Sequence, residues 1–284
     1  MKLLIWTASL LTLAGLVSNT AGASIYEQQA RRSSSQCEPF RSTFKTSDAS
    51  QTLRKSDSFV AVSPEGSYNL GPGGLDLYLE KPDKPVHTKN GVNNIVAEGA
   101  TINSTFTMLY GKVSFEVVAP PVAGIVTAAI LLADQHDEID IELLGGDPKH
   151  WQTNIFAASP KDKEPLWGVF GEIQDFTNWK SSVSYTHNYT IDWNADRIIW
   201  SVDGSAVRTL HRCQCPSTIQ FLIADTNING TLHYPSHPTR VQLGIWDASN
   251  PAGTSEWARG PIDWSNAPPK YTATFRSITV ECPY

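Results

Sequence analysis

The sequence predicts an all-β fold, a sandwich or a barrel, for the folded part of the chain. From Phe59 onward, short runs rich in β-branched and aromatic residues alternate with turn residues, and 19 glycines and 18 prolines supply the turns. No long segment shows the 3.6-residue apolar period of a helix, and the chain has no internal repeat. Many short strands with frequent turns are typical of sandwiches and barrels. The length of 284 residues suits one all-β domain and also allows two small ones.

Strands are predicted where an alternating or apolar run is bounded by turn residues. Residues 75–79 alternate, and prolines at 82 and 85 end that run. Residues 189–193 and 197–202 flank Asn194-Ala195-Asp196 and form a predicted hairpin, after which Asp203-Gly204 turns the chain again. The other predicted strands cover residues 106–118, 125–133, 139–144, 151–156, 241–246 and 271–280.

The most informative stretch runs from His136 to Gly146 and alternates acidic and apolar side chains. Because a strand has a period of two, Glu138, Asp140 and Glu142 share one face and the intervening Ile and Leu residues share the other. Three carboxylates this close repel one another, so packing alone does not explain them. One carboxyl held protonated beside one held ionised is the pair that cleavage of a glycosidic bond requires.

A solvent-facing acidic edge and a cation site are the alternatives for this stretch. The very apolar run of residues 124–133 comes shortly before it and places the acidic strand in the middle of a sheet. Acidic residues are rarer there and more often functional. We therefore expect catalysis by these carboxyls, with no metal and no cofactor.

The first 23 residues are predicted to be a secretory signal peptide. Lys2 supplies a positive start, residues 3–17 are apolar, and Ala21-Gly22-Ala23 fits a cleavage site. A membrane anchor is the alternative, but the apolar stretch is too short for a span. Residues 24–58 are polar and expected to be loosely ordered, which places the folded catalytic domain at 59–284. The chain has a formal net charge of −6 and no basic cluster that would favour nucleic acid.

The cysteines agree with secretion, because an even count of four in a secreted chain predicts two disulfides. Cys213 and Cys215 are too close to bond each other without strain, so each is expected to pair with Cys37 or Cys282. A zinc site is the alternative, but no histidine spacing supports it.

Three sequons fit a secreted glycoprotein, although each is weak alone. They begin at Asn103, Asn188 and Asn229. The printed chain ends without a Ser/Thr-rich stalk or an apolar tail, so we expect no GPI signal in it.

The acidic stretch also resembles a known family. Asp137-Glu138-Ile139-Asp140-Ile141-Glu142, followed by Leu144-Gly145-Gly146-Asp147, resembles the active-site strand of glycoside hydrolase family 16. The Gly-Gly-Asp ending resembles the fungal cell-wall branch of that family, the Crh (Congo red hypersensitive) chitin–glucan transglycosylases. The resemblance covers roughly residues 60 to 282. That branch usually reads Ala-Gly-Gly where this chain has Ala258-Arg259-Gly260, and its cysteine-rich N-terminus is reduced here to Cys37.

The resemblance implies a jelly roll of two antiparallel sheets whose concave face carries the substrate cleft. It implies that Glu138 is the nucleophile, Glu142 the acid/base, and Asp140 an assisting residue that tunes Glu138. Retention needs the two carboxyl groups about 5 Å apart, and long Glu side chains on a bent strand can close that gap. Glu142 must start protonated, so we expect its two neighbours to raise its pKa. His136 either modulates Glu138 or is a bystander.

Substrate contacts are expected from the same resemblance. Trp246 and Trp257 are expected to be sugar platforms, because the apolar faces of pyranose rings pack well on indole. Trp193, Trp200 and Trp264 are placed in the core. The other expected substrate-binding residues are Glu142, Gln242, Thr254, Tyr110, Lys112, Gln152 and Asn154.

The function expected from these features is that of a secreted fungal cell-wall transglycosylase. It would cleave a chitin or β-glucan donor with retention and transfer it to β-glucan or chitin. Chitin and β-1,3/1,6-glucan are the expected partners of a monomer with no membrane span. The alternatives are an endo-β-1,3(4)-glucanase and a non-catalytic carbohydrate-binding wall protein, and the presence of all three acids weighs against the second.

Overall fold

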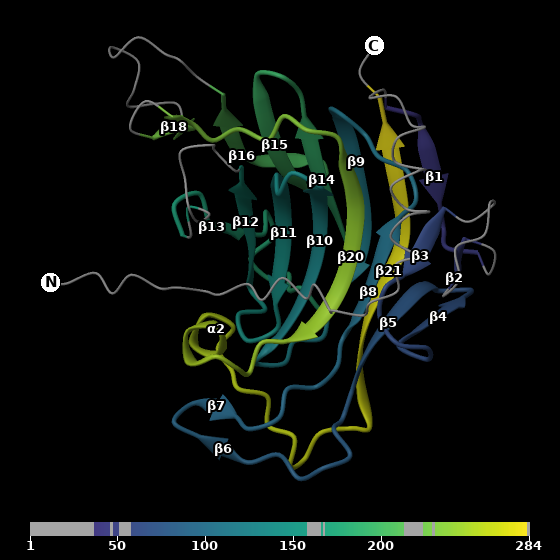
Figure 1. The fold of residues 1–284 in the computed structure, drawn as a ribbon, viewed down its shortest axis with the longest axis vertical. Helices are drawn as coiled ribbons and strands as arrows, with labels where there is room; N and C mark the ends of the chain where they lie inside the picture. Colours follow the sequence, from purple (N-terminus) through teal and green to yellow (C-terminus); the bar gives the residue numbers. More distant parts are fainter. Residues whose placement is uncertain are drawn as a thin grey trace, which may run out of the picture.

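Two large β-sheets pack face to face and form a sandwich (Figure 1). The computed structural model describes residues 37–45, 48–50, 58–157, 166, 168–212, 224–228 and 231–282. The predicted signal peptide and the residues Cys213, Cys215 and Asn229 lie outside the described residues. The prediction of an all-β sandwich is confirmed.

The first sheet has nine strands in the order β17-β16-β15-β14-β9-β21-β5-β4, with β1 paired to β21. Neighbours are antiparallel, except that β16 and β17 are parallel. Its strands are β1 (Phe40–Ser42), β4 (Tyr68–Gly71), β5 (Gly74–Glu80), β9 (Gly111–Val118), β14 (His187–Trp193), β15 (Arg197–Val202), β16 (Ser205–His211), β17 (Ala224–Asp225) and β21 (Lys270–Glu281).

The second sheet has eight strands in the order β13-β12-β11-β10-β20-β8-β3-β2. All neighbours are antiparallel except β2 and β3. Its strands are β2 (Ala49–Ser50), β3 (Phe59–Ala61), β8 (Ala100–Ser104), β10 (Ile125–Ala133), β11 (Glu138–Leu144), β12 (His150–Phe156), β13 (Glu172–Asp175) and β20 (Thr239–Asp247). Two small hairpins complete the strands: β6 (Thr88–Lys89) with β7 (Val92–Asn93), and β18 (Asn227–Ile228) with β19 (Thr231–Leu232).

The core lies between the two sheets and takes every second side chain of each long strand. Trp193, Trp200 and Trp264 are all buried there, as the sequence predicted. Trp200 of β15 also reaches across the core, where its indole N–H donates a 3.1 Å hydrogen bond to the backbone carbonyl of Asp140 on β11. Through this hydrogen bond, the first sheet contacts the backbone of the acidic strand from the core side.

The N-terminal segment is more ordered than the sequence suggested. β1 pairs with β21 in the first sheet, and β2 pairs with β3 in the second, so residues before 59 belong to the folded unit. The disulfide prediction needs correction, because Cys37 bonds Cys282 with a Cα–Cα distance of 5.4 Å. The two ends of the described chain meet on neighbouring strands, and neither cysteine is left for Cys213 or Cys215.

Other elements match the predictions with small differences. The hairpin of β14 and β15 is confirmed, and the following turn has positive φ at both Asp203 and Gly204. The strand predicted at 106–118 begins only at Gly111. One short helix, α2 (Ala252–Trp257), was not predicted, and its six residues are too few to show a helical period. Among the described residues, no helix has the length and hydropathy to cross a membrane.

Candidate active site

Glu138, Asp140 and Glu142 lie on one face of β11, as the alternation predicted. Their neighbours Ile139 and Ile141 are buried in the core. β11 is held between β10 and β12, where Asp140 is opposite Ile130 on one side and Asn154 on the other. The acidic strand is therefore internal to the sheet. We call the face that carries these three side chains the carboxylate face.

All three carboxyls have raised pKa values, with burial as the largest cause, and they differ in what the neighbouring groups add. Burial, and then the charge of Glu138, raise the pKa of Glu142 to about 8. Burial also raises the pKa of Asp140 well above its usual range, with the charges of Glu138 and Glu142 adding to it. Burial raises the pKa of Glu138 too, but a hydrogen bond from Asp140 and the charge of His136 act in the opposite direction. Glu138 is thus the member that gives up its proton most readily, and Asp140 donates to it.

A buried acid anchors the start of β11. Asp137 is 1% exposed, and its Oδ2 accepts hydrogen bonds from the backbone N–H groups of Ser236 at 2.7 Å and His237 at 3.0 Å. The Nδ1 of His237 lies 2.7 Å from the same oxygen. These contacts fasten the loop before β20 to the turn before Glu138. His136 is exposed in that turn with φ 70°.

The two glycines after β11 are required by close backbone contacts. A Cβ at Gly145 would lie 2.4 Å from the carbonyl oxygens of Pro120 and Val122. A Cβ at Gly146 would lie 2.5 Å from the carbonyl oxygen of Ala258, just after α2. The Gly-Gly ending of the acidic stretch therefore brings the end of α2 against the end of β11.

An aromatic pair lies at this end of the carboxylate face. The rings of Trp246 on β20 and Trp257 on α2 stack with centroids 5.9 Å apart and planes at 22°. Both are half-buried and pack on a small apolar cluster separate from the main core. The indole N–H of Trp257 donates a 2.9 Å hydrogen bond to Oε1 of Gln152, which is the β12 partner of Glu142. Figure 1 shows β20, β10, β11 and β12 side by side, with α2 at one end of β20.

A row of side chains, polar except for Ile130, crosses the carboxylate face through Asp140. Residues that pair across strands point to the same face, so Asn154, Asp140 and Ile130 form one line, which continues to Gln242 of β20 and Asn103 of β8. The carboxylate face thus brings together Gln242, Gln152 and Asn154, which the sequence named as contacts.

Asn103 was missed as a site residue because it was interpreted only as a sequon. It is 9% exposed, and its Oδ1 is buried without a hydrogen-bond partner among the described residues. Its alternation with the fully buried Ile102 could have indicated its face, but only the register of β8 against β20 places it next to Gln242. Its burial also makes it a poor glycan acceptor, whereas Asn188 is exposed.

Two predicted contacts lie elsewhere, and the prediction for them is corrected. Lys112 is on β9 of the opposite sheet, where its Nζ lies 3.2 Å from Glu281. Tyr110 precedes β9 and packs edge-to-face on the core residue Trp193, with ring centroids 4.9 Å apart. The alternation of a strand says which residues share a face, but not which sheet the strand joins.

Thr254 lies on α2 but faces inward. It is 5% exposed, and its hydroxyl oxygen is buried without a hydrogen-bond partner among the described residues. This burial favours a role in seating α2 over direct contact with a sugar.

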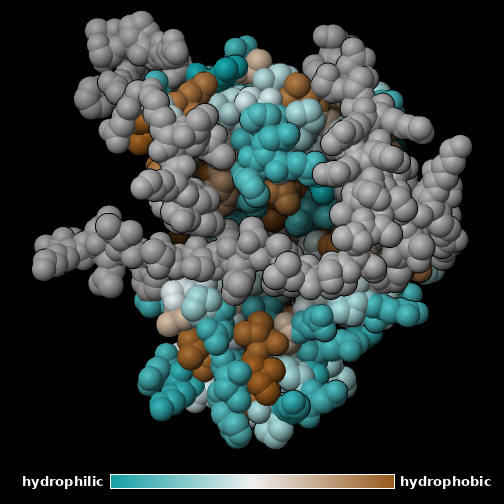
Figure 2. All heavy atoms as spheres, in the orientation of Figure 1, coloured by the Kyte–Doolittle hydropathy of each residue, from teal (hydrophilic) through white to brown (hydrophobic). Residues whose placement is uncertain are grey.

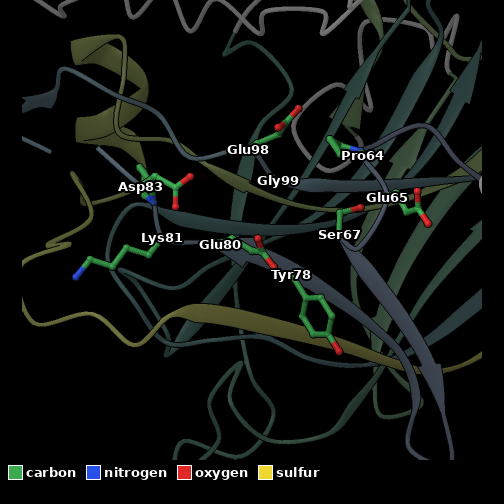
Figure 3. Close-up of a pocket in the computed structure, with 10 residues that line it drawn as sticks. Pro64, Glu65, Ser67, Tyr78, Glu80, Lys81, Asp83, Glu98 and Gly99 are labelled. Carbon is green, nitrogen blue, oxygen red and sulfur yellow. The ribbon is translucent and has the colours of Figure 1, made fainter. Parts of the chain in front are cut away.

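The described residues contain no group of three or more His, Cys, Asp or Glu side chains arranged to hold a metal ion. A hollow of about 190 Å³ lies away from the carboxylate face, beside β5 and the residues before β8 (Figure 3). Glu65, Glu80, Asp83 and Glu98 are among its lining residues. Figure 2 shows that hydrophilic side chains also dominate the described part of the visible surface.

Comparison with known proteins identifies the relatives of this chain. The model of the family Glycosyl hydrolases family 16 matches residues 56–266 of this chain. Crh-like protein 4 of Botryotinia fuckeliana is 34% identical over 226 residues, which cover 76% of this chain and 50% of that protein. Congo red hypersensitive protein 1 of Saccharomyces cerevisiae is 30% identical over 246 residues, which cover 82% of this chain and 40% of that protein. The chain thus spans about half the length, or less, of these relatives.

Solved structures agree with these matches. The Crh5 transglycosylase in complex with NAG superposes with a TM-score of 0.64 at 27% identity, covering 88% of this chain and 89% of that one. A Bacillus licheniformis β-glucanase superposes with a TM-score of 0.58 at 18% identity, covering 87% of this chain and 99% of that one, and shares the fold. The family match, the relatives and the jelly-roll sandwich agree, and the chain belongs to glycoside hydrolase family 16.

Proposed function

We propose that this chain is a cell-wall transglycosylase that cleaves a β-linked donor, chitin or β-glucan, and transfers it with retention to a β-glucan or chitin acceptor. The observation that carries the proposal is the set of Glu138, Asp140 and Glu142 along one face of β11, which we call the carboxylate row. In this row, burial raises the pKa of Glu142 to about 8, and Asp140 donates a hydrogen bond to Glu138. The similarity to Crh-like proteins supports the choice of polymer.

The row can supply both halves of a retaining reaction. Glu142 keeps its proton at neutral pH and can donate it to the glycosidic oxygen of the leaving chain. Glu138 attacks the anomeric carbon as a carboxylate, and a covalent glycosyl-enzyme forms. Glu142, now ionised, removes a proton from an acceptor hydroxyl, which attacks the same carbon and releases Glu138. Asp140 stays protonated and stabilises the charge of Glu138 in the free enzyme.

Sugar contacts are assigned along the carboxylate face. The stacked Trp246 and Trp257 offer an apolar platform for pyranose rings, and their orientation is held by the Trp257–Gln152 hydrogen bond. Gln242 and Asn103 continue the polar row across the sheet. The Oδ1 of Asn103 is buried, as the Thr254 hydroxyl is, so Asn103 is assigned a supporting place in this row and no direct sugar contact.

Secretion to a fungal cell wall is part of the proposal. It rests on the signal-like residues 1–23 and on the fungal relatives, and the disulfide between Cys37 and Cys282 suits an oxidising compartment. Asn188 is the exposed sequon among the described residues and is the proposed glycan site. We propose that the chain acts as a monomer.

The test is a transfer assay with purified secreted protein. A chito-oligosaccharide donor is incubated with fluorescent β-glucan or chitin oligosaccharide acceptors, and the size of labelled products is followed. We expect labelled products longer than the acceptor, and none with Glu138→Gln, because no covalent intermediate can form. Shortened donor without labelled extension would indicate a hydrolase instead. Equal behaviour of the variant and the parent would refute the catalytic assignment.

A further inference from the structure

The segment between β13 and β14, residues 176–186, presents an unusually exposed aromatic side chain. Trp179 is 82% exposed, the highest value among the large hydrophobic residues described, and Tyr185 in the same segment is 59% exposed. The ammonium of Lys180 lies 5.2 Å from the centre of the Trp179 ring, which leaves the opposite ring face for another group. A single exposed apolar residue is ordinary, so a site here needs further support.

That support comes from the way the segment is held. Ser181 Oγ lies 2.5 Å from His187 Nε2, and His187 Nδ1 lies 2.7 Å from Asp203 Oδ2. Phe176 stacks on the same imidazole with ring centroids 4.5 Å apart. His187 of β14 thus holds the segment at its start, through Phe176, and at its centre, through Ser181.

Backbone contacts fix the middle of the segment. Val183 is buried, its N–H donates to the carbonyl of Pro148, and its carbonyl accepts from the N–H of Ala119. Lys149 donates a 3.1 Å hydrogen bond to the Ser181 carbonyl. The segment is therefore held in place while the Trp179 indole stays exposed to solvent. Such a pre-ordered surface lowers the entropic cost of binding.

The Ser181–His187–Asp203 chain has the order of an acyl-transfer triad, but it does not fit that chemistry. Ser181 and His187 are each 7% exposed, so the hydroxyl has no room for an acyl group. The three residues act as a structural clamp. By holding the segment to the sheet, they keep Trp179 in a fixed position.

The segment continues directly from the edge of the sheet that carries the catalytic carboxyls. β13 is the edge strand beside β12, with Ile173 opposite Gln152 and Asp175 opposite His150. Ile173 therefore shares the carboxylate face and is 57% exposed. With strands spaced about 4.8 Å apart, Ile173 is roughly 10 Å from the Glu142 position, about two sugar units along a polymer that crosses the sheet. Trp179 follows four residues after Asp175.

We propose that Trp179, flanked by Tyr185, is a surface binding platform for a β-linked polysaccharide chain that extends beyond the carboxylate face over β12 and β13. The ligand is a chain of glucose or N-acetylglucosamine units whose apolar ring faces stack on the indole. The inference rests on the proposed function for its choice of polymer. The platform holds the polymer and takes no part in bond cleavage.

The test measures binding of the Glu138→Gln chain to insoluble chitin and, separately, to insoluble β-1,3-glucan by sedimentation. Adding Trp179→Ala should weaken binding about three- to tenfold on at least one polymer, whereas Trp179→Phe should retain most of it. Tyr78→Ala is the matched control, because Tyr78 also has an ammonium over its ring, that of Lys270 at 3.3 Å, but lies on the opposite sheet. Tyr78→Ala should bind like the parent. The polymer whose binding weakens in Trp179→Ala is the one that occupies the platform.

Three results would overturn the proposal: parent-like binding by Trp179→Ala on both polymers, an equal loss in Tyr78→Ala, or no binding of the parent to either polymer. Transfer between short oligosaccharides by protein with Glu138 intact tests the catalytic proposal separately, and Trp179→Ala should leave that rate unchanged. Loss of short-substrate transfer together with polymer binding would also contradict the platform, since it would indicate damage to the carboxylate face.

Discussion

Arg208 and the carboxylate row are both charged groups buried in this sandwich, and they are built in opposite ways. The guanidinium of Arg208, on β16, donates to the carbonyl and hydroxyl of Thr153 and to the carbonyl of Phe170, at 2.7 to 3.1 Å. Glu172 lies 3.4 Å from its Nε. The carboxylate row gathers like charges instead, and Asp140 Oδ1 has no partner among the described residues.

The difference separates a structural charge from a catalytic one. Arg208 has hydrogen-bond acceptors and a counter-charge, and its guanidinium lies 4.7 Å from the Trp200 ring, whose N–H in turn supports Asp140. Burial and like charges disfavour the ionised forms of Asp140 and Glu142 and raise their pKa values, which costs folding free energy. Removing the first kind of charge should therefore weaken the fold, and removing the second kind should strengthen it.

The largest expected effect is that of Arg208→Met. The change leaves two buried carbonyls, one hydroxyl and Glu172 without their cation, and breaking such a buried cluster costs about 3–5 kcal/mol. Urea unfolding measures the loss. Arg208→Lys is the control: it keeps the charge but not the planar fork, so it should lose less. A loss under about 1 kcal/mol in the Met variant would contradict the structural role.

Glu142→Gln should show the opposite sign. The folded-state pKa of about 8 lies above the ordinary 4.5, so the stabilisation from binding the proton is complete below 4.5 and is lost as pH rises through about 8. Gln carries no charge, so the inactive variant should be more stable than the parent at pH 9, by about 1 kcal/mol or more. Thermal unfolding at pH 5 and pH 9 measures this. Glu98→Gln, at an exposed residue, should show no such difference.

The sequence predicts this functional strand well because the relevant information is local. The alternation from Glu138 to Leu143 assigns both faces of β11, and the structure agrees. The direction of the Glu142 pKa agrees with the prediction, although burial contributes more than charge, and the neighbour whose charge adds to it is Glu138. Neighbouring residues on one strand fix which side chains share a face, whereas the burial that dominates the Glu142 pKa depends on how the rest of the chain packs.

What the sequence could not predict depends on pairing between distant segments. Asn103 faces the site because β8 pairs with β20 in a register that sets it opposite Gln242. Lys112 leaves the site because β9 joins the other sheet. Cys37 meets Cys282 across a separation of 245 residues because β1 pairs with β21. Each outcome needs the sheet order, which periodicity does not contain.

A smaller effect should separate the roles within the carboxylate row. The hydrogen bond from Asp140 lowers the pKa of Glu138, so Asp140→Ala should raise that pKa. The acidic limb of the pH profile of kcat/KM should move up by roughly one pH unit, since a charged hydrogen bond is worth about 1.5 kcal/mol. Asp140→Asn keeps an N–H donor, so its limb should stay near that of the parent. Equal limbs in both variants would exclude tuning by this bond.

The smallest predicted effect concerns backbone strain beside the site, at Arg259. α2 ends in a Schellman turn, in which the N–H of Arg259 donates to Glu256 and that of Gly260 to Ser255. Arg259 is exposed and holds φ 57°, a conformation that suits glycine. Arg259→Gly should therefore stabilise the fold by about 1 kcal/mol, or about 2–4 °C in Tm.

Asp203→Gly is the control, because Asp203 has φ 50° but its carboxylate binds His187 and the N–H of Asn188. Losing those bonds should outweigh the relief of strain and lower Tm. A gain at both positions would mean that backbone strain outweighs the clamp, and no gain at Arg259 would mean that the strained arginine makes a compensating contact.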